Sequence, residues 1–273
     1  MRRLSGGYTI VEVMIFLAIS GIIFAAAATL FQGQQGKTQF EQGMRDLASK
    51  IQQYVDQVGS SEFNGGGQYN CAISNSTGRA ELSAGNANTG TNQGCVFLGR
   101  AIQVLPGQPN VYIYSVLGSQ YDSNGDTVTS YAGALPEPAF NTGADISEEY
   151  DTTWGKVLSS KVTYTSGSTV NSTLVSFYNS LQDGYQKSGA AGGPSITARG
   201  YNYNDNSLSS IKSTALKSCL EEQSANGVDC TNTPTINNWS ACFASTGSSQ
   251  TAILSVTSTP AGITTDANFT SCS

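Results

Sequence analysis

The chain has 273 residues, of which only 12% are charged, and its net charge is −6. An average soluble domain has about 25% charged residues, so uncharged polar residues and glycine must supply most of this surface. The acidic balance gives no support for nonspecific nucleic-acid binding. The absence of histidine excludes Ser-His-Asp and Cys-His catalytic sites and mixed Cys/His zinc sites. No GxGxxG or GxxxxGK[ST] phosphate-binding motif occurs, so we do not expect an enzyme.

The first predicted element is an apolar segment near the N-terminus. Residues 13–31 read VMIFLAISGIIFAAAATLF, and about 20 such residues span a bilayer as a helix. Arg2 and Arg3 precede the segment, as is typical of an end kept in the cytoplasm. Glu12 is unusual at this place, because a charge inside a membrane helix costs about 2.5–3.5 kcal/mol on insertion scales.

Three interpretations compete for this segment. An ordinary secretory signal would be cleaved near the small residues at 25–29, and a plain anchor would stay uncleaved. Neither gives a purpose to Glu12, since a buried carboxylate is stable only when it is paired. The third interpretation gives it one: the segment resembles a family signal that is cut after a glycine, and a cut after Gly7 would place the new amine of Tyr8 within one helical turn of the carboxylate.

This arrangement resembles the class III signal of the type IV pilin and type II secretion pseudopilin superfamily. That signal is a short basic leader ending in Gly, a hydrophobic residue, a Glu five places after the cut, and an apolar helix. Here the leader would be residues 1–7, Tyr8 would become the first residue, and Glu12 would be the fifth. Gly21 matches a glycine common at the fourteenth place, whereas Thr29 stands where the family often has a helix-breaking proline.

The resemblance covers about residues 1–58, and it implies a processing and assembly route. A prepilin peptidase would cut between Gly7 and Tyr8, Tyr8 would be N-methylated, and Glu12 would meet the amine of a neighbouring subunit. The chain would be inserted in the cytoplasmic membrane of a bacterium and then built by an inner-membrane assembly platform, with other pilin subunits, into an extracellular surface filament.

The helix is predicted to continue beyond the apolar segment. Apolar residues recur every three or four positions, at Phe40, Met44, Leu47, Ile51, Val55 and Val58. Residues 8–58 would form one helix about 75 Å long, with 8–31 in a membrane or filament core and 37–58 against a head. Gly33 and Gly36 each weaken a helix by about 1 kcal/mol relative to Ala. We expect a flexible joint there, with a continuous helix as the alternative.

Residues 59–193 are predicted to form a mainly antiparallel β head. From residue 59 onward, seven segments rich in β-branched and aromatic residues favour strands, the last two of them beyond residue 193: 95–105, 110–118, 127–134, 161–167, 172–181, 195–203 and 251–258. Asn124 and Gly125 predict a type I′ hairpin turn. The fold class is therefore α+β, a long N-terminal helix packed against an antiparallel sheet, and the resemblance implies the same pilin-like architecture.

Residues 194–273 are predicted to form a C-terminal extension tied by disulfides. The GAAGGP sequence at 189–194 is typical of a boundary, and 207–225 has one apolar helical face that Gly227 could end. Two short strands would then lead to Cys272. The extension is either an elaboration of one head or a small second lobe, and we expect the former.

The six cysteines all follow the apolar segment, at 71, 95, 219, 230, 242 and 272. An even number beyond a membrane-directed segment favours disulfides in an oxidising compartment, although free buried thiols remain the alternative. Six cysteines allow 15 connectivities. Pairing of sequence neighbours, our expectation, would give Cys71–Cys95, Cys219–Cys230 and Cys242–Cys272.

One turn could hold calcium. Asp122, Asn124 and Asp126 alternate as the first ligands of a calcium loop do. The glycine is misplaced for an EF-hand and the closing Glu is absent, so we expect a plain turn and no cofactor. Aromatic residues at alternating strand positions are better explained as core than as a stacking surface for glycans or single-stranded DNA.

The sequence thus predicts a structural subunit of a type IV pilus-like filament. The large head favours a minor or tip subunit, exposed for adhesion, motility or DNA uptake, although no motif identifies a surface ligand or DNA. Two alternatives are a pseudopilin of a type II secretion system and a monomeric membrane-anchored or secreted binding protein.

Overall fold

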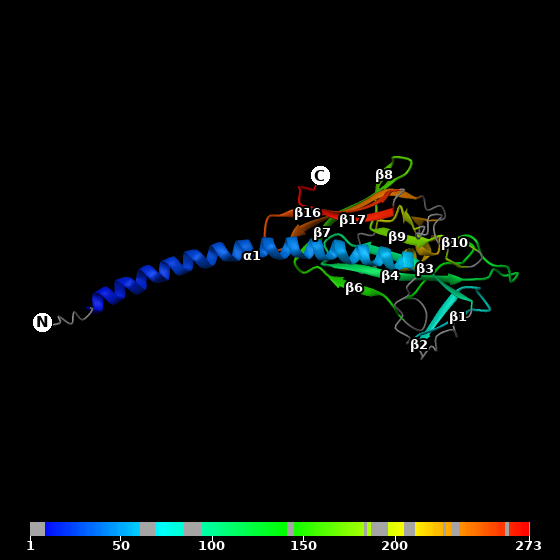
Figure 1. The fold of residues 1–273 in the computed structure, drawn as a ribbon, viewed down its shortest axis with the longest axis horizontal. Helices are drawn as coiled ribbons and strands as arrows, with labels where there is room; N and C mark the ends of the chain where they lie inside the picture. Colours follow the sequence, from blue (N-terminus) through cyan, green and yellow to red (C-terminus); the bar gives the residue numbers. More distant parts are fainter. Residues whose placement is uncertain are drawn as a thin grey trace.

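A computed structural model describes residues 9–60, 69–84, 94–140, 145–182, 185–186, 196–204, 211–225, 228–230, 235–259 and 262–272. One long helix enters a head that is built around two large antiparallel sheets (Figure 1). The fold is therefore α+β, as the sequence predicts.

The long helix, α1, runs from Ile10 to Ser60 without interruption. Its 51 residues correspond to about 75 Å at 1.5 Å per residue. The helix passes through Gly33 and Gly36, so the flexible joint expected there is wrong and the continuous alternative holds. Figure 1 shows the N-terminal half of α1 projecting from the head with a gentle curve.

The larger sheet has six antiparallel strands. Their order is β12-β9-β3-β4-β5, and β6 pairs with the other end of β4. The bounds are β3 Cys95–Val104, β4 Asn110–Ser119, β5 Glu137–Pro138, β6 Glu148–Asp151, β9 Leu174–Asn179 and β12 Ile196–Gly200.

The second sheet has five antiparallel strands in the order β17-β16-β15-β7-β8. The bounds are β7 Gly155–Tyr164, β8 Thr169–Asn171, β15 Ile236–Ser245, β16 Thr251–Thr259 and β17 Gly262–Asn268. Burial alternates along β16, from Ala252 to Val256, as expected for a sheet with one face on the core.

The remaining regular elements of the described residues are small. Three two-stranded hairpins and a short helix, α2, complete the described residues: β1 Tyr69–Ile73 with β2 Ala80–Ala84, β10 Leu181–Gln182 with β11 Tyr185–Gln186, β13 Ser224–Ala225 with β14 Val228–Asp229, and α2 Thr214–Leu220.

The second half of α1 lies in the main hydrophobic core. Its apolar stripe packs against residues of both large sheets, and in Figure 1 this half runs between β16 and β17 on one side and β3 and β4 on the other. The six side chains of the stripe, and Tyr54 beside them, are at most 2% exposed: Phe40, Met44, Leu47, Ile51, Tyr54, Val55 and Val58. Burial of each contributes about 1.5–3 kcal/mol, so the head holds this half of the helix firmly.

A side-chain amide of α1 also covers the edge of the five-stranded sheet. Gln52 donates from Nε2 to the carbonyl of Ile263 over 3.2 Å and accepts the backbone N–H of Thr265 at 3.0 Å. These groups belong to β17, which pairs with β16 alone. The amide therefore takes the place of a further strand, which protects an otherwise open edge.

The strand expected at 127–134 is wrong. Thr127 makes a single bridge to Tyr121, and turns follow. Val128, Tyr131 and Ala134 are all buried, and their spacing of three is that of a helical turn, not of a strand. The N–H of Ala134 accordingly bonds to the carbonyl of Ser130.

The helix expected at 207–225 is shorter than predicted, and residues 205–210 lie outside the described residues. The Ser213 side chain accepts the N–H of Leu216 and so caps the start of α2. Glu222 takes φ 55° just after the end, so the helix stops well before Gly227, itself outside the described residues.

Residues beyond 194 take part in both large sheets. β12 pairs with β9, and β15 pairs with β7 along its whole length. After α2 the chain forms three strands of the five-stranded sheet, β15, β16 and β17, where we expected two short ones. These pairings make the C-terminal extension an integral part of one head and not a separate lobe.

Candidate functional site: the apolar half of the N-terminal helix

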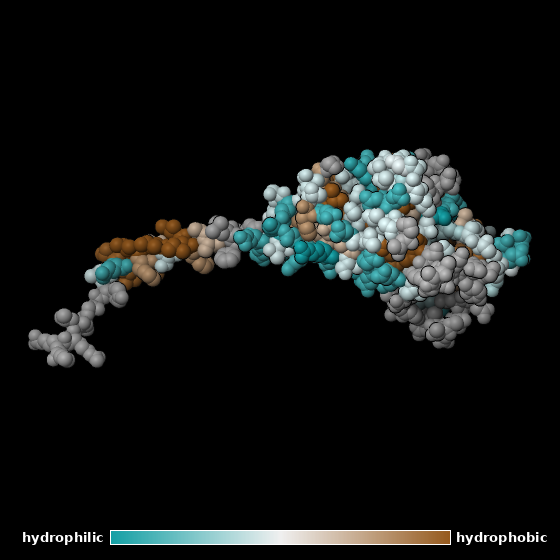
Figure 2. Space-filling view, turned by 45° about the horizontal axis from the view of Figure 1, so that its top comes forward, coloured by the Kyte–Doolittle hydropathy of each residue, from teal (hydrophilic) through white to brown (hydrophobic). Residues whose placement is uncertain are grey.

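The N-terminal half of α1 presents a continuous apolar surface. Residues Ile10–Ala27 are long and apolar enough to cross a membrane, and none of this window is buried. Figure 2 shows the apolar surface standing clear of the head. Eleven large side chains are between 46% and 80% exposed: Ile10, Val11, Val13, Met14, Ile15, Phe16, Leu17, Ile19, Ile22, Ile23 and Phe24. A surface of this size requires lipid or other apolar helices around it.

Glu12 is held at the start of this helix by Thr9. The backbone N–H and the hydroxyl of Thr9 both donate to Oε2 of Glu12 over 2.9 Å, and the Glu12 N–H bonds to the Thr9 hydroxyl at 3.3 Å. This reciprocal pattern is a capping box. The sequence carries this Thr-x-x-Glu signal, which predicts the capping role of Thr9; the resemblance treats Thr9 only as part of the segment between the cut and Glu12. The predicted cleavage residues Gly7 and Tyr8 lie outside the described residues.

Two glycines of α1 allow the head to approach the helix closely. A Cβ at position 36 would lie 2.5 Å from the carbonyl oxygen of Gly247, and a Cβ at position 43 would overlap the ring of Trp154. Trp154 in turn packs edge-on against Phe40, with ring centroids 5.8 Å apart. The role of Gly36 is therefore close packing, which explains why the helix has a glycine there and yet does not bend.

A polar cavity of about 530 Å³ lies at this junction, between α1 and the head. Gln39, Gln42 and Asp46 line it from the helix, and Tyr150 and Trp154 from the head. The Tyr150 hydroxyl donates to Asp46 over 2.5 Å. The cavity is close to the apolar half of α1, so membrane or neighbouring helices would restrict access to it.

A buried arginine fixes the other end of the helix to the six-stranded sheet. Arg100 of β3 is 1% exposed and bonds to Glu148 at 2.8 Å, and the Tyr54 hydroxyl donates to the same carboxylate at 2.6 Å. Burial acts to raise the pKa of Glu148, but the bonds from Tyr54 and Arg100 outweigh it and lower the pKa. Glu148, in the SEEYD sequence at 147–151, thus forms a structural ion pair with Arg100.

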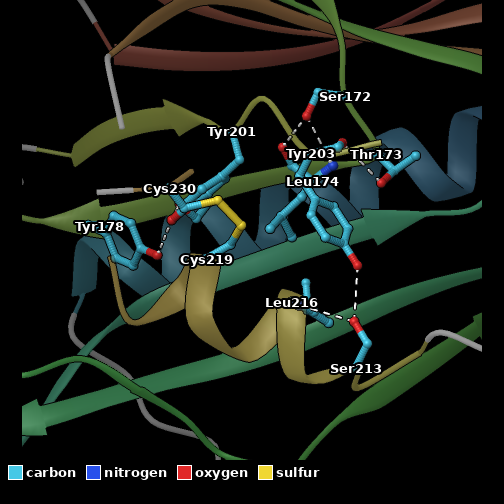
Figure 3. Close-up of a disulfide and its surroundings, with 11 residues drawn as sticks. Ser172, Thr173, Leu174, Tyr178, Tyr201, Tyr203, Ser213, Leu216, Cys219 and Cys230 are labelled. Atoms are coloured by element: carbon cyan, nitrogen blue, oxygen red, sulfur yellow. Dashed lines mark hydrogen bonds between the residues drawn. A yellow bond between two sulfur atoms is a disulfide. The ribbon is translucent and has the colours of Figure 1, made fainter. Parts of the chain in front are cut away.

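All six cysteines are in disulfides, and the pairs are those of sequence neighbours: Cys71–Cys95, Cys219–Cys230 and Cys242–Cys272. The first joins β1 to β3, and the third fixes the C-terminal segment to β15. The second joins α2 to the residue after β14 and lies beside buried tyrosines (Figure 3). In that view the Tyr203 hydroxyl contacts Ser213, the residue that caps α2, over 3.1 Å.

The calcium candidates form a tight turn. Oδ1 of Asp122 accepts the backbone N–H groups of Asn124 at 2.8 Å and Asp126 at 3.0 Å. Within this turn Gly125 has a positive φ, 86°, and Asn124 does not, so the expected type I′ turn, which needs two such residues, is wrong. Because Oδ1 of Asp122 already accepts these backbone N–H groups, the backbone of Asn124 need not adopt the left-handed conformation. Among the residues described, no group of three or more cysteine or carboxylate side chains could hold a metal.

Comparison with known proteins identifies the N-terminal segment. A family model described as the prokaryotic N-terminal methylation motif matches residues 2–28. The motif, with the apolar helix that follows it, is consistent with the class III signal of type IV pilin-like proteins and supports a pilin-like or pseudopilin-like protein. It implies processing by a prepilin peptidase and assembly with other pilin-type subunits. No curated protein and no solved structure matches the chain significantly.

Proposed function

We propose that this chain is a structural subunit of a type IV pilus-like surface filament. It is held in the cytoplasmic membrane by the apolar half of α1 and displayed outside the cell after assembly. One observation carries the proposal: the segment with the methylation motif, residues 2–28, includes the exposed apolar window Ile10–Ala27, and the helix that contains this window continues without a break into the core of the head.

The continuous helix suits a subunit that is moved and held by its N-terminal half. Force applied to residues 10–27 passes along α1 to a stripe buried between two sheets. A Cβ at Gly21 would meet nothing within 4 Å, so this glycine lies on open surface, where small residues let helices approach closely in apolar surroundings. We propose that the α1 helices of neighbouring subunits pack along this surface in the filament core.

Glu12 has two partners in this proposal. Within the chain, the Thr9 N–H and hydroxyl bind its carboxylate. After cleavage and methylation at Tyr8, the positive amine of a neighbouring subunit pairs with the same carboxylate, which gives the subunits their register. A charge in an apolar setting is tolerated when such a partner is present.

We further propose a non-enzymatic role without a cofactor. The absence of histidine supports it, as does the local bonding of the calcium candidates in their turn. The two-sheet head is large for a filament subunit, which favours a minor or tip position. The exposed head would serve adhesion, motility or DNA uptake, and the acidic net charge of −6 disfavours the last of these.

The test is the N-terminal residue and intact mass of the mature protein in sheared surface material. We expect a chain that begins at methylated Tyr8 and is enriched in the filament fraction. A processed chain that stays in the cell envelope and supports protein secretion would instead identify a secretion pseudopilin. A chain that begins at Met1 or near Thr29 would exclude filament assembly and favour a monomeric anchored or secreted protein.

A further inference from the structure

The head has a further cavity, at the end that faces away from the apolar half of α1. It lies between the turn that joins β1 to β2 and the turn that follows β4, and Figure 1 shows this hairpin at the end of the head opposite the N-terminus. Its volume is about 410 Å³, within the range of about 300–1,000 Å³ typical of small-molecule sites. This end stays accessible when α1 is embedded in a membrane or filament.

The lining combines one aromatic ring with several short polar side chains. Tyr121 is 43% exposed, so its side chain is accessible to a ligand. Ile73 and Leu135 supply apolar surface. The polar lining residues are Asn75, Ser76, Thr77, Asp122 and Ser123. A sugar ring has the matching chemistry, because its C–H face packs on an aromatic ring while its hydroxyls need amide, hydroxyl and carboxylate partners.

One wall of the cavity is held in place by its own backbone. Oδ1 of Asp122 accepts two backbone N–H groups, from Asn124 and Asp126, so the carboxylate is oriented before any ligand arrives. The Ser119 hydroxyl donates to the Tyr121 carbonyl over 2.6 Å. A preorganised wall lowers the entropy that binding must offset.

The opposite wall contains two residues in the left-handed region. Gly78 has φ 68° and Leu135 has φ 49°, and a Cβ at position 78 would lie 3.1 Å from Cδ1 of Leu135. A non-glycine residue such as Leu135 is strained in this conformation, and residues of this kind gather at active sites and ligand-binding sites. The disulfide Cys71–Cys95 braces the adjoining strand.

The charge of the cavity limits the class of ligand. Asp122 is the one charged residue in its described lining, and the N–H groups of Asn124 and Asp126 lower its pKa, so the carboxylate stays ionised in mildly acidic surroundings. An anionic ligand such as a sialylated glycan or single-stranded DNA would meet a like charge. A neutral ligand would meet an acceptor for its hydroxyls.

From these observations we infer that the cavity binds a neutral saccharide, with a sugar ring stacked on Tyr121 and its hydroxyls bonded to Asp122 and Asn75. The inference rests on the proposed function only in requiring that this end of the head be exposed. If the chain is a filament subunit, the inference identifies the ligand of its head as neutral surface glycans and not nucleic acid.

Binding is measured with the full processed chain in lauryldimethylamine oxide, a detergent without a sugar headgroup that could compete. The probes are labelled neutral oligosaccharides ending in glucose, galactose, mannose or N-acetylglucosamine, together with a sialylated glycan and single-stranded DNA. We expect a submillimolar Kd for at least one neutral probe. Tyr121→Ala weakens it by about tenfold or more, whereas Tyr121→Phe, which keeps the ring, changes it by less than about threefold.

Leu158→Ala is the matched control, because it removes an exposed apolar side chain of β7 that does not line the cavity, and it leaves the Kd unchanged. If Tyr121→Ala does not fold, Asn75→Ala on the opposite wall is tested in its place, and we expect it to bind the neutral probe more weakly than the wild type does. The inference is overturned if no neutral probe binds, if both wall variants bind as the wild type does, or if only the anionic probes bind. Filament assembly is scored separately, so a chain that assembles without binding sugar refutes this inference alone.

Discussion

The hydroxyl of Tyr131 donates a hydrogen bond of 2.9 Å to the backbone carbonyl of Leu220, the last residue of α2. Both residues are buried, and the last carbonyls of a helix have no partner within it. At the other end of α2, the hydroxyls of Tyr203 and the N-cap Ser213 lie 3.1 Å apart. Buried tyrosines therefore hold both ends of this short helix, which at seven residues could not persist alone.

Tyr131→Phe tests this anchoring. The ring and its packing on Tyr178 remain, but the Leu220 carbonyl loses its donor, so we expect the head to lose about 1–3 kcal/mol of unfolding free energy. Tyr121→Phe is the control, because its side chain is exposed, and its effect should stay within about 0.5 kcal/mol. Chemical denaturation of both variants measures this, and equal stabilities would show that the bond contributes nothing.

Gly36→Ala is expected to destabilise the head, against the usual helix preference. Alanine is favoured over glycine in a helix by about 1 kcal/mol, but here the added Cβ would lie 2.5 Å from the Gly247 carbonyl oxygen. Backbone can shift only at a cost, and overpacking typically costs about 1–3 kcal/mol. Gly21→Ala, where the Cβ meets nothing, should leave the melting temperature of the head unchanged. A rise in melting temperature for Gly36→Ala would contradict the close packing.

The stability of the head should fall as pH rises from about 5 to 7. Glu137 lies beneath α2, 2.9 Å from Lys217, and burial, together with the neighbouring Glu221 carboxyl, raises its pKa to about 7 from 4.5. Between these values the folded state holds a proton that the unfolded state has released, so raising the pH lowers the unfolding free energy. For one proton the slope cannot exceed about 1.4 kcal/mol per pH unit.

Thermal unfolding across that range measures the slope. Glu137→Gln should flatten it, whereas Glu149→Gln, at an exposed carboxylate of β6, should keep it. Identical slopes in the wild type and Glu137→Gln would assign the pH dependence to other groups.

The disulfide Cys242–Cys272 closes a loop with a sequence separation of 30, against 11 for Cys219–Cys230. Replacing both members of a pair by serine should cost about 2–4 kcal/mol, with the larger loss for the longer loop. Denaturation of the two double variants under non-reducing conditions gives the comparison. An equal or reversed order would show that loop entropy does not dominate.

Variants of Glu12 and Thr9 distinguish the two proposed roles of the Glu12 carboxylate, which are capping by Thr9 and pairing with the amine of a neighbouring subunit. Glu12→Gln keeps an acceptor for the Thr9 N–H but removes the charge that a neighbouring amine would meet, so we expect filament assembly to be lost while helix content is kept. Thr9→Val keeps the charge and removes the hydroxyl of the cap, at a cost of about 0.5–2 kcal/mol, and should still assemble. The measurement is the amount of processed chain in the sheared fraction. If Glu12→Gln assembles normally, the carboxylate caps the helix but does not pair with a neighbouring amine during assembly.

The sequence by itself determined the elements whose causes are local. The apolar segment and the stripe from Phe40 to Val58 predict one helix, and the structure has it from Ile10 to Ser60. The β-branched segments predict β3 and β4, and the predicted first residues, Cys95 and Asn110, are those of the structure. Both patterns are periodicities that the chain carries within a few residues, and the methylation motif is likewise a local spacing.

Only the tertiary structure decided the roles that depend on residues far apart in the chain. The sequence predicts a flexible joint at Gly36, but the structure shows that Gly247 packs against it. The sequence predicts a strand at 127–134, but in the structure the Tyr131 hydroxyl of this segment bonds to the end of α2. The cavity proposed to bind a saccharide is lined by Asn75, Tyr121 and Leu135, which are far apart in the sequence. Neither hydrophobic periodicity nor secondary-structure propensity predicts such long-range contacts. These contacts form when the sheets pack and bring distant segments of the chain together.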